Sequence, residues 1–224
     1  MKQVFVATSN PGKIRDFAGA ASRYGIEIVP LPNFASLPQV AEDGATFEAN
    51  ARKKAEAYSQ YLAGRVVIAD DSGLEVDALG GAPGVHSARY AADEPAAAEA
   101  NTDDEANNAK LIREIQRVPL EERTGRFVCW IAAARDGKTL AVFEGKAEGV
   151  ILDKPRGENG FGYDPLFYFP EIKRTFAELE AAEKAKYSHR GAAFREFLRW
   201  YHKVENQENA SSSIKSLSDS RRLP

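Results

Sequence analysis

The sequence predicts an α/β fold built on a mixed β-sheet flanked by helices. In the first half of the chain, short β-branched segments alternate with amphipathic helical segments, a pattern typical of parallel strands. Later, the pair Asp136-Gly137 separates two long apolar segments and predicts an antiparallel hairpin. Most of the glycine-rich and polar segments follow a predicted strand. Because open α/β sheets bind ligands at such loops, we expect the functional site there.

The composition predicts a cytoplasmic protein that binds neither nucleic acid nor a membrane. The formal net charge is −3, so no basic field attracts nucleic acid. No apolar segment approaches the ~20 residues of a membrane span, and the first residues have a strand pattern instead of a signal peptide. We expect one domain over residues 1–204 and a polar, disordered tail over residues 205–224. The single Cys129 excludes an intrachain disulfide and indicates a buried small side chain.

The first half contains three strands and two helices. Strands are expected at residues 4–7 and 26–29, and a helix from Ile14 to Ala21 lies between them. After a polar loop, Thr46 is a helix N-cap, and the next helix has an apolar face of Phe47, Ala51, Ala55, Tyr58 and Leu62. The third strand, residues 66–69, runs into the sequence Asp70-Asp71-Ser72-Gly73.

The second half adds the hairpin and more helices. Thr102 and Glu105 form a capping box, and strands are expected at residues 126–135 and 139–152. Residues 154–165 are a second glycine-rich loop, followed by a strand at residues 166–169. A further capping box, Thr175 with Glu178, predicts a helix through about Lys184, and Ser188 caps the last helix, with Phe194, Phe197, Leu198 and Tyr201 on its buried side.

Asp70 and Asp71 are candidate metal ligands. Two adjacent carboxylates at the end of a buried strand need compensation to stay ionised, and Mg²⁺ provides it through carboxylate oxygens. The alternative is a polar turn in which one Asp caps the next element. Glu42 and Asp43, in the loop before Thr46, are further candidate ligands, and the alternative for both is a solvated acidic loop.

Two other segments are candidate anion sites. Residues 8–13, Thr-Ser-Asn-Pro-Gly-Lys, place a hydroxyl, backbone amides and an ammonium at a helix start, as phosphate sites do. The alternative is a simple turn with Ser9 or Asn10 as N-cap. Asn50 and Lys54 lie one helical turn apart and face the same way, either at a site or as a surface pair.

The remaining candidates suit a base and a further anion. Phe161-Gly162-Tyr163-Asp164 combines aromatic rings with a carboxylate, as base-stacking sites do, although a β-turn explains the same residues. Lys184, His189 and Arg190 surround a helix start, where cations are unfavourable unless an anion or carbonyl binds; exposed basic residues are the alternative. A nucleoside triphosphate with Mg²⁺ is the ligand that uses all of these groups.

Five segments in order resemble the inosine triphosphate pyrophosphatase family, whose members hydrolyse ITP, dITP and XTP. They read ATSNPGK, TFEANARKKA, IADDSGLEVDALGGAPGVHSARYA, GFGYDPLF and KYSHRG. The resemblance runs from Val4 to about Tyr201. It implies an elongated sheet with two lobes, a cleft between them, a homodimer, and cleavage between the α- and β-phosphates.

The same resemblance assigns roles to individual residues. Asp71 would hold Mg²⁺ and act as the base toward water, with Asp70 beside it and Glu42 as a further ligand. Ser72 would touch substrate. The residues that would cradle the triphosphate or lie near it are Thr8, Ser9, Asn10, Pro11, Gly12, Lys13, Asn50 and Lys54. Those that would form the base pocket are Phe161, Gly162, Tyr163, Asp164, Lys184, His189 and Arg190.

The chemistry of these side chains gives two further expectations, and two alternative functions stay open. A nearby cation lowers the pKa of a carboxyl, so we expect Asp71 to orient water more than to take its proton. The Arg190 guanidinium, which only donates, would favour a 6-oxo purine over adenine. The rivals are a pyrophosphatase for modified pyrimidine or methylated guanine nucleotides, as in Maf-like proteins, and a non-catalytic nucleotide-binding module.

Overall fold

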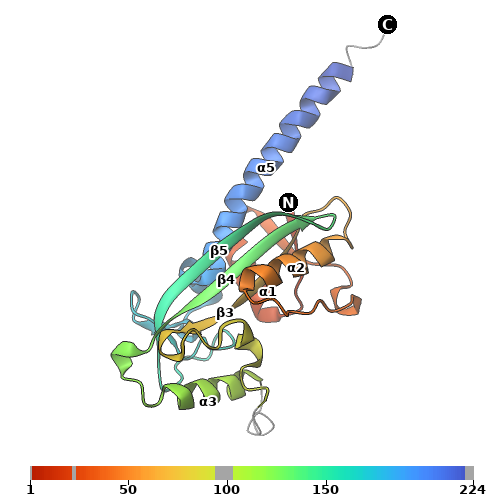
Figure 1. Cartoon of the computed structure of the whole chain (residues 1–224). Coiled ribbons are helices and arrows are strands. Elements are labelled where there is room, and N and C mark those ends of the chain that lie inside the picture. Colours follow the sequence, from red (N-terminus) through yellow and green to blue (C-terminus); the bar gives the residue numbers. More distant parts are fainter. Residues whose placement is uncertain (1, 22–23, 94–102, 220–224) are drawn as a thin grey trace.

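The computed structural model describes residues 2–21, 24–93 and 103–219 and contains a seven-stranded mixed sheet with helices on both faces (Figure 1). The strand order is β2-β1-β3-β4-β5-β6-β7. Strand β1 is parallel to β2 and β3, and the remaining neighbours are antiparallel. The predicted fold class is confirmed. The strands are β1 (Lys2–Val6), β2 (Ile26–Pro30), β3 (Val67–Val76), β4 (Thr124–Arg135), β5 (Lys138–Ile151), β6 (Phe167–Phe169) and β7 (Arg174–Thr175).

The first two helices are present, but the second ends at Ser59, before Leu62 of its predicted apolar face. Helix α1 (Pro11–Ala21) begins with a proline, whose missing N–H costs nothing in the first turn. Helix α2 (Phe47–Ser59) is capped by the Thr46 hydroxyl, which accepts from the Ala49 N–H at 3.1 Å. The loop between β2 and α2 contains one short 3-10 turn, η2 (Phe34–Ser36).

Strand β3 is longer than we predicted, and this changes the setting of the acidic pair. The sequence Asp70-Asp71-Ser72-Gly73 lies inside β3, not in a turn after it. The reason is pairing with a distant strand: β3 is antiparallel to β4 from Val67 opposite Ala134 to Val76 opposite Gly125. The alternative of a polar capping turn is therefore wrong.

The predicted hairpin is present. Asp136 and Gly137 both have positive φ, 51° and 78°, as a two-residue hairpin turn requires. The hairpin of β4 and β5 is long, so it reaches from the region of α1 and α2 to the region of α3 (Asp103–Ile115) (Figure 1). The sheet is elongated for this reason. Cys129 in β4 is buried, as predicted.

The last part of the chain departs from prediction at one helix. The Thr175–Glu178 capping box exists, but it starts only a 3-10 turn, η7 (Phe176–Glu178). Helix α4 (Ala181–Tyr187) then begins separately after Glu180. The Ser188 hydroxyl accepts from the Gly191 N–H at 3.1 Å and caps helix α5 (His189–Asp219). The capping box predicted at Thr102 lies outside the described residues.

Helix α5 extends through Asp219, where the composition predicts an irregular tail. Figure 1 shows this helix projecting away from the sheet toward the C-terminus. The domain boundary at residue 204 stays a prediction. Within the described residues, no helix has the length and apolar character needed to cross a membrane.

The core is divided by the sheet and its two ends. Ile68 packs with Phe17, Phe194 and Phe197 on the face that α1 and α5 cover. Ala69 packs on the opposite face with Ala51, Ala55 and Tyr58 of α2. A third cluster, at the end of the sheet near α3, is made by Leu74, Val76, Leu111, Ile115, Phe127, Tyr163, Leu166, Phe167 and Phe176. The 3-10 turns η3 (Asp77–Leu79) and η4 (Gly84–Arg89) follow β3 there, and η6 (Leu120–Glu122) precedes β4.

Candidate active site

A cavity of about 530 Å³, here called the cleft, lies beside β3. It forms because β1 stops early: β1 pairs with β3 only at Val67 and Ile68, so no strand of the described residues covers this edge of β3 from Asp70 to Gly73. From Leu74 onward the segment that follows β3 covers the edge again. The predicted site residues that line it are Thr8, Ser9, Asn10, Lys13, Glu42, Lys54, Asp70, Asp71, Ser72, Phe161, Gly162, Tyr163, Asp164, Lys184, His189 and Arg190. The other three, Pro11, Gly12 and Asn50, do not line it.

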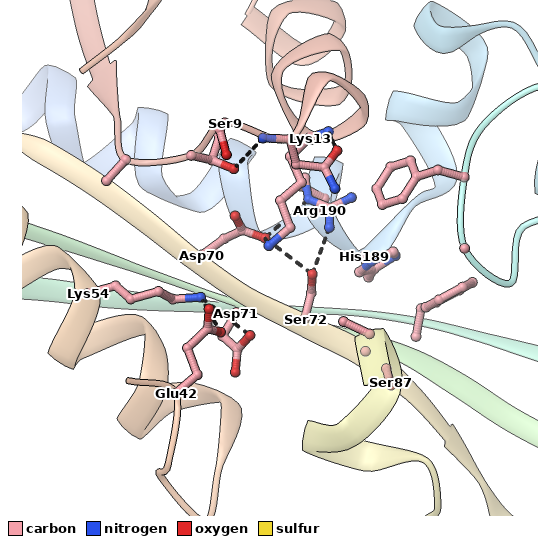
Figure 2. Close-up of a pocket in the computed structure, with 18 of the residues that line it drawn as sticks. Ser9, Lys13, Glu42, Lys54, Asp70, Asp71, Ser72, Ser87, His189 and Arg190 are labelled. Atoms are coloured by element: carbon pink, nitrogen blue, oxygen red, sulfur yellow. Dashed lines mark hydrogen bonds and ion pairs between the residues drawn. The ribbon is translucent and has the colours of Figure 1, made fainter. Parts of the chain in front are cut away.

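Asp70 and Asp71 reach the cleft from opposite faces of the sheet. Consecutive side chains of a strand alternate between faces, and the neighbours Ile68 and Ala69 already pack on different sides. Figure 2 shows Lys13, Asp70 and Arg190 on one side of β3, and Lys54, Asp71 and Glu42 on the other. The cleft thus wraps around the open edge of the strand.

The Asp70 carboxylate is an anchor for cations. Its Oδ2 atom lies 3.0 Å from Lys13 Nζ and 3.4 Å from Arg190 Nε, and it accepts from the Ser72 hydroxyl at 3.2 Å. Burial alone would raise the pKa of Asp70, but Lys13 and Arg190 outweigh it and hold the pKa well below the usual range. Asp70 is therefore ionised at neutral pH.

The Asp71 carboxylate has a different environment. It accepts from Asn50 Nδ2 at 2.9 Å and lies 3.5 Å from Lys54 Nζ, which also contacts Glu42 Oε2 at 2.7 Å. Burial raises the pKa of Asp71, and the nearby Lys54 ammonium does not fully offset this. Among the protein groups, desolvation therefore dominates the pKa of Asp71. The lowered pKa that we expect beside a bound cation stays a prediction.

Glu42 and Asp71 form the donor pair that suits Mg²⁺. Both offer carboxylate oxygens beside the same ammonium, and Mg²⁺ in nucleotide sites takes one or two carboxylates plus phosphate oxygens. In the described part of the chain, no group of three or more Asp, Glu, His or Cys side chains could hold a metal. Asp70, predicted as a third ligand, lies on the other face with its own cations. The pair Glu42–Asp71 therefore suits the metal, and Asp70 as a further ligand stays a prediction. Asp43, the other candidate of that loop, is exposed and lies 2.7 Å from Lys53 Nζ.

Asn50 links this carboxylate to the loop that carries Glu42. Its Oδ1 accepts from the Gly44 N–H at 2.8 Å, while its Nδ2 donates to Asp71. The side chain is 1% exposed, so the alternative of a surface pair with Lys54 is wrong. A Cβ on Gly44 would stand 2.7 Å from that Oδ1, which explains the glycine. The structure places Asn50 behind Asp71, outside the cleft.

A side chain of the segment before α1 accepts hydrogen bonds from the first backbone N–H groups of that helix. Asn10 Oδ1 accepts from the N–H groups of Gly12 and Lys13 at 2.8 and 3.2 Å, and the Asn10 N–H donates to the Thr8 hydroxyl. Asn10 is thus the N-cap, as the alternative to a phosphate cradle predicts. The Thr8 hydroxyl and the Lys13 ammonium still face the cleft.

The far end of the cleft combines an aromatic ring with buried cations. Lys184 Nζ lies 2.6 Å from Asp164 Oδ2 and 5.0 Å from the Phe161 ring centroid, and Arg190 Cζ is 5.4 Å from the same centroid. The Phe161 N–H donates to Asp164 Oδ2 at 2.9 Å. A Cβ on Gly12 would stand 2.4 Å from the Phe161 ring, so α1 packs directly against this ring. Phe161 and Asp164 therefore belong to an ordered aromatic site.

Asp16 is a member of this end that the sequence did not reveal. Its Oδ2 lies 2.6 Å from Arg190 Nη1 and 3.6 Å from Lys184 Nζ. With Asp70 and the Ser72 hydroxyl, which lies 2.7 Å from Nη2, it engages three of the five N–H groups of the Arg190 guanidinium. Asp16 carried no signal, because one Asp in an amphipathic helix looks like a surface residue.

His189 is buried and neutral. Its ring stacks on Phe127 at 4.6 Å with an angle of 9°, and its Nδ1 has no hydrogen-bond partner among the described residues. Burial, with Arg190 and Lys184 nearby, holds the pKa of His189 well below its usual value. A neutral imidazole can donate from one nitrogen and accept at the other.

Ser87 was also missed, although it lies in the glycine-rich segment after β3. Its hydroxyl accepts from the Leu74 N–H at 2.9 Å and donates to the Gly84 carbonyl at 2.6 Å. Its own carbonyl accepts from the Tyr163 hydroxyl at 2.8 Å. Ser87 thereby connects β3, η4 and the aromatic loop. The density of glycines from residue 80 to 84 was the available signal.

Comparisons with known proteins agree on one family. Residues 4–200 match the model of the Ham1 family. The chain is 52% identical to a dITP/XTP pyrophosphatase of Geobacillus kaustophilus over 86% of this chain and 91% of that protein. It is 50% identical to a dITP/XTP pyrophosphatase of Acidobacterium capsulatum, covering 87% and 96%. The solved Staphylococcus aureus Ham1 protein has a TM-score of 0.73 and 40% identity, covering 91% of this chain and all of that one.

Proposed function

We propose, on the premise that this chain belongs to the Ham1 family, that its cleft binds and hydrolyses non-standard purine nucleoside triphosphates. The substrates are ITP, dITP and XTP, and the products are the nucleoside monophosphate and pyrophosphate. The named relatives at about half identity support this activity. We further propose that the protein works in the cytoplasm as a homodimer whose two lobes flank the cleft.

Besides membership of the family, one observation on the structure supports the proposed activity. A single cleft holds the Glu42–Asp71 carboxylate pair with Lys54 at one end and the Phe161 ring with Lys184 and Asp164 at the other. Phosphates need cations, hard cations need carboxylates, and a planar base needs an aromatic face. A nucleoside triphosphate carries phosphates for the first end and a planar base for the second.

Glu42 and Asp71 are the proposed ligands of Mg²⁺. When bound, the ion would neutralise phosphate charge and polarise the phosphoanhydride. Lys54 contacts both carboxylates and is itself held strongly protonated: burial would lower its pKa, but Asp71, Asp70 and Glu42 raise it. Its ammonium is therefore a permanent positive charge beside the reacting phosphates.

Asp71 is the proposed general base. Its carboxylate, held by Asn50 and Lys54, would accept a proton from a water molecule that attacks the α-phosphorus. The oxygen of that water forms the new bond to phosphorus, and the bond to the bridging oxygen of the β-phosphate breaks. Pyrophosphate then leaves with the charge that Lys13 and Lys54 stabilise.

The aromatic end is proposed to select the base. Phe161 offers a stacking face, and Lys184, His189 and the remaining N–H groups of Arg190 can donate to a 6-oxo group. Adenine presents an amino donor at that position, so it would leave these donors unpaired. Asp164 orients Lys184 by direct contact.

The test is pyrophosphate release from ITP, XTP, GTP, ATP and dTTP, each with Mg²⁺ and with EDTA. We expect Mg²⁺-dependent release that is fastest with ITP and XTP. Fast release from dTTP instead would favour the Maf-like alternative. Binding of ITP without any product would favour a non-catalytic module.

A further inference from the structure

Two side chains of helix α3 hold the backbone of Gly162 from both sides. The Gly162 N–H donates to Asp104 Oδ2 at 2.7 Å, and the Gly162 carbonyl accepts from Asn108 Nδ2 at 2.9 Å. Asp104 and Asn108 are one helical turn apart, so their side chains leave α3 on the same face. Together they fix the two peptide groups that flank Gly162.

Gly162 needs such support because of its conformation. Its φ of +61° is in the left-handed region, which glycine reaches without strain but also leaves easily. No Cβ fixes the backbone there. Bonds to the N–H and the carbonyl are therefore the available means of holding this residue, and α3 supplies both.

The two fixed peptide groups connect the aromatic residues of the base end. Phe161 precedes Gly162 and lies beside the cations Lys184 and Arg190. Tyr163 follows it, and its hydroxyl donates to the Ser87 carbonyl. A rotation at Gly162 would move both rings, because each is joined to it by one peptide bond. The position of Gly162 therefore sets the shape of the base end of the cleft.

The Asn108 amide also has a buried oxygen without a hydrogen bond, which costs free energy of folding and is unusual for a residue that serves packing alone. Its Oδ1 atom is buried and has no hydrogen-bond partner among the described residues. Buried polar atoms are nearly always paired, and exceptions often lie at functional sites. Since Nδ2 already serves the Gly162 carbonyl, the orientation of the amide follows from that contact.

We propose that Asp104 and Asn108 are positioning residues that set the purine specificity of the cleft through Gly162. Asp104 itself lines the cleft and Asn108 does not, and the role proposed for both is to hold Phe161 and Tyr163 in place through Gly162. The proposal rests on the proposed function, because it concerns recognition of the base of that substrate.

The test compares four variants of the full chain with the wild type. Asp104→Ala and Asn108→Ala each remove one bond to Gly162. Asp104→Asn keeps an acceptor for the Gly162 N–H. Ala109→Asn adds an amide at an exposed position of the same helix and is the control. Steady-state pyrophosphate release is measured with ITP and with ATP.

We expect both alanine variants to raise the KM for ITP about tenfold and to leave kcat within about twofold. The preference for ITP over ATP in kcat/KM should fall by a similar factor. Asp104→Asn should restore the KM, and Ala109→Asn should match the wild type. Partial unfolding would instead lower kcat without changing the KM. That pattern, or an unchanged preference in both alanine variants, would overturn the proposal.

Hydrogen exchange separates this proposal from the proposed function. Loss of either bond should speed exchange of the amides at residues 161–163, whatever the protein hydrolyses. Unchanged exchange in both alanine variants rejects the contact itself, even in an active enzyme. A wild type that releases no pyrophosphate from ITP or XTP rejects the proposed function, and the specificity role of α3 with it.

Discussion

Asp70 and Asp71 are consecutive residues of β3, yet different elements on opposite faces of the sheet hold their carboxylates. Asp70 meets Lys13 of α1 and Arg190 of α5, whereas Asp71 meets Asn50 and Lys54 of α2. The pKa of Asp70 is held below its usual range, and the pKa of Asp71 is raised. Replacing Asp71 should therefore mainly lower turnover, whereas replacing Asp70 should mainly lower the stability of the protein.

Replacing Asp71 with Asn should abolish turnover and keep the fold. The amide cannot accept a proton from water, and general-base catalysis is worth about a hundredfold or more. The fold should survive because burial already disfavours the charged form of Asp71 and raises its pKa, and because Lys54 keeps its contact with Glu42. We would measure kcat for ITP and the thermal midpoint. Near-wild-type turnover would reject Asp71 as the base.

Replacing Asp70 with Asn should destabilise the whole protein. Asp70 and Arg190 have side chains only 2% and 3% exposed, so the variant removes one of the two carboxylates of a buried guanidinium, which keeps Asp16, and also removes the partner of Lys13. Breaking a buried ion pair from one side costs about 3–5 kcal/mol. Urea denaturation would measure this loss. The control, Asp43→Asn, removes an exposed partner of Lys53 and should leave the unfolding free energy nearly unchanged. Equal stability of the two variants would contradict the prediction.

Asn50 should act on the rate through Asp71. Asn50→Asp keeps an acceptor for the Gly44 N–H but loses the donor to Asp71, and Asn50→Ala loses both bonds. Since a misplaced catalytic group slows the chemical step, we expect kcat to fall about tenfold or more in both, with the KM for ITP little changed.

The comparison of the two Asn50 variants locates the effect. If Asn50→Asp keeps the wild-type kcat while Asn50→Ala loses it, the link to Gly44 matters and the bond to Asp71 does not. A large rise of the KM in both would instead favour direct contact with substrate, which is the role that the sequence resemblance implies.

Local signals in the sequence were sufficient for most elements. Asp136-Gly137 specifies its hairpin because both residues tolerate positive φ, and the Thr46 and Ser188 hydroxyls cap the helices that follow them. These features depend on a few neighbouring residues. The cleft residues came from ordered motifs and their resemblance to a family, since each short segment also had an ordinary structural explanation.

Features that depend on distant pairing were missed. The polar residues of Asp70-Asp71-Ser72-Gly73 favour a turn, but β4, almost 60 residues later, pairs with them along their whole length. Asp16 is 174 residues from Arg190 in the chain, so no local pattern predicts their contact. The raised pKa of Asp71 likewise depends on burial by the assembled sheet and helices, which spacing along the chain does not give.

His189 should make stability depend on pH. In the native state burial holds the pKa of His189 well below its ordinary value of 6.5, so the ring stays neutral, whereas the unfolded chain binds a proton below that pH. The unfolded state then binds more protons, so the unfolding free energy falls as the pH drops through about 6.5. The slope approaches about 1.4 kcal/mol per pH unit.

His189→Phe keeps the stack on Phe127 and removes this titration. Chemical denaturation of both proteins from pH 5 to 7.5 tests the prediction, because the titration of Asp71 and Asp164 is common to both and cancels in the difference. The two curves should run parallel above pH 7 and diverge below 6.5, with the wild type losing stability faster. Parallel curves over the whole range would mean that His189 gains its proton over the same pH range in the folded and the unfolded protein. That result would contradict the prediction of a buried, neutral ring beside Phe127, Lys184 and Arg190.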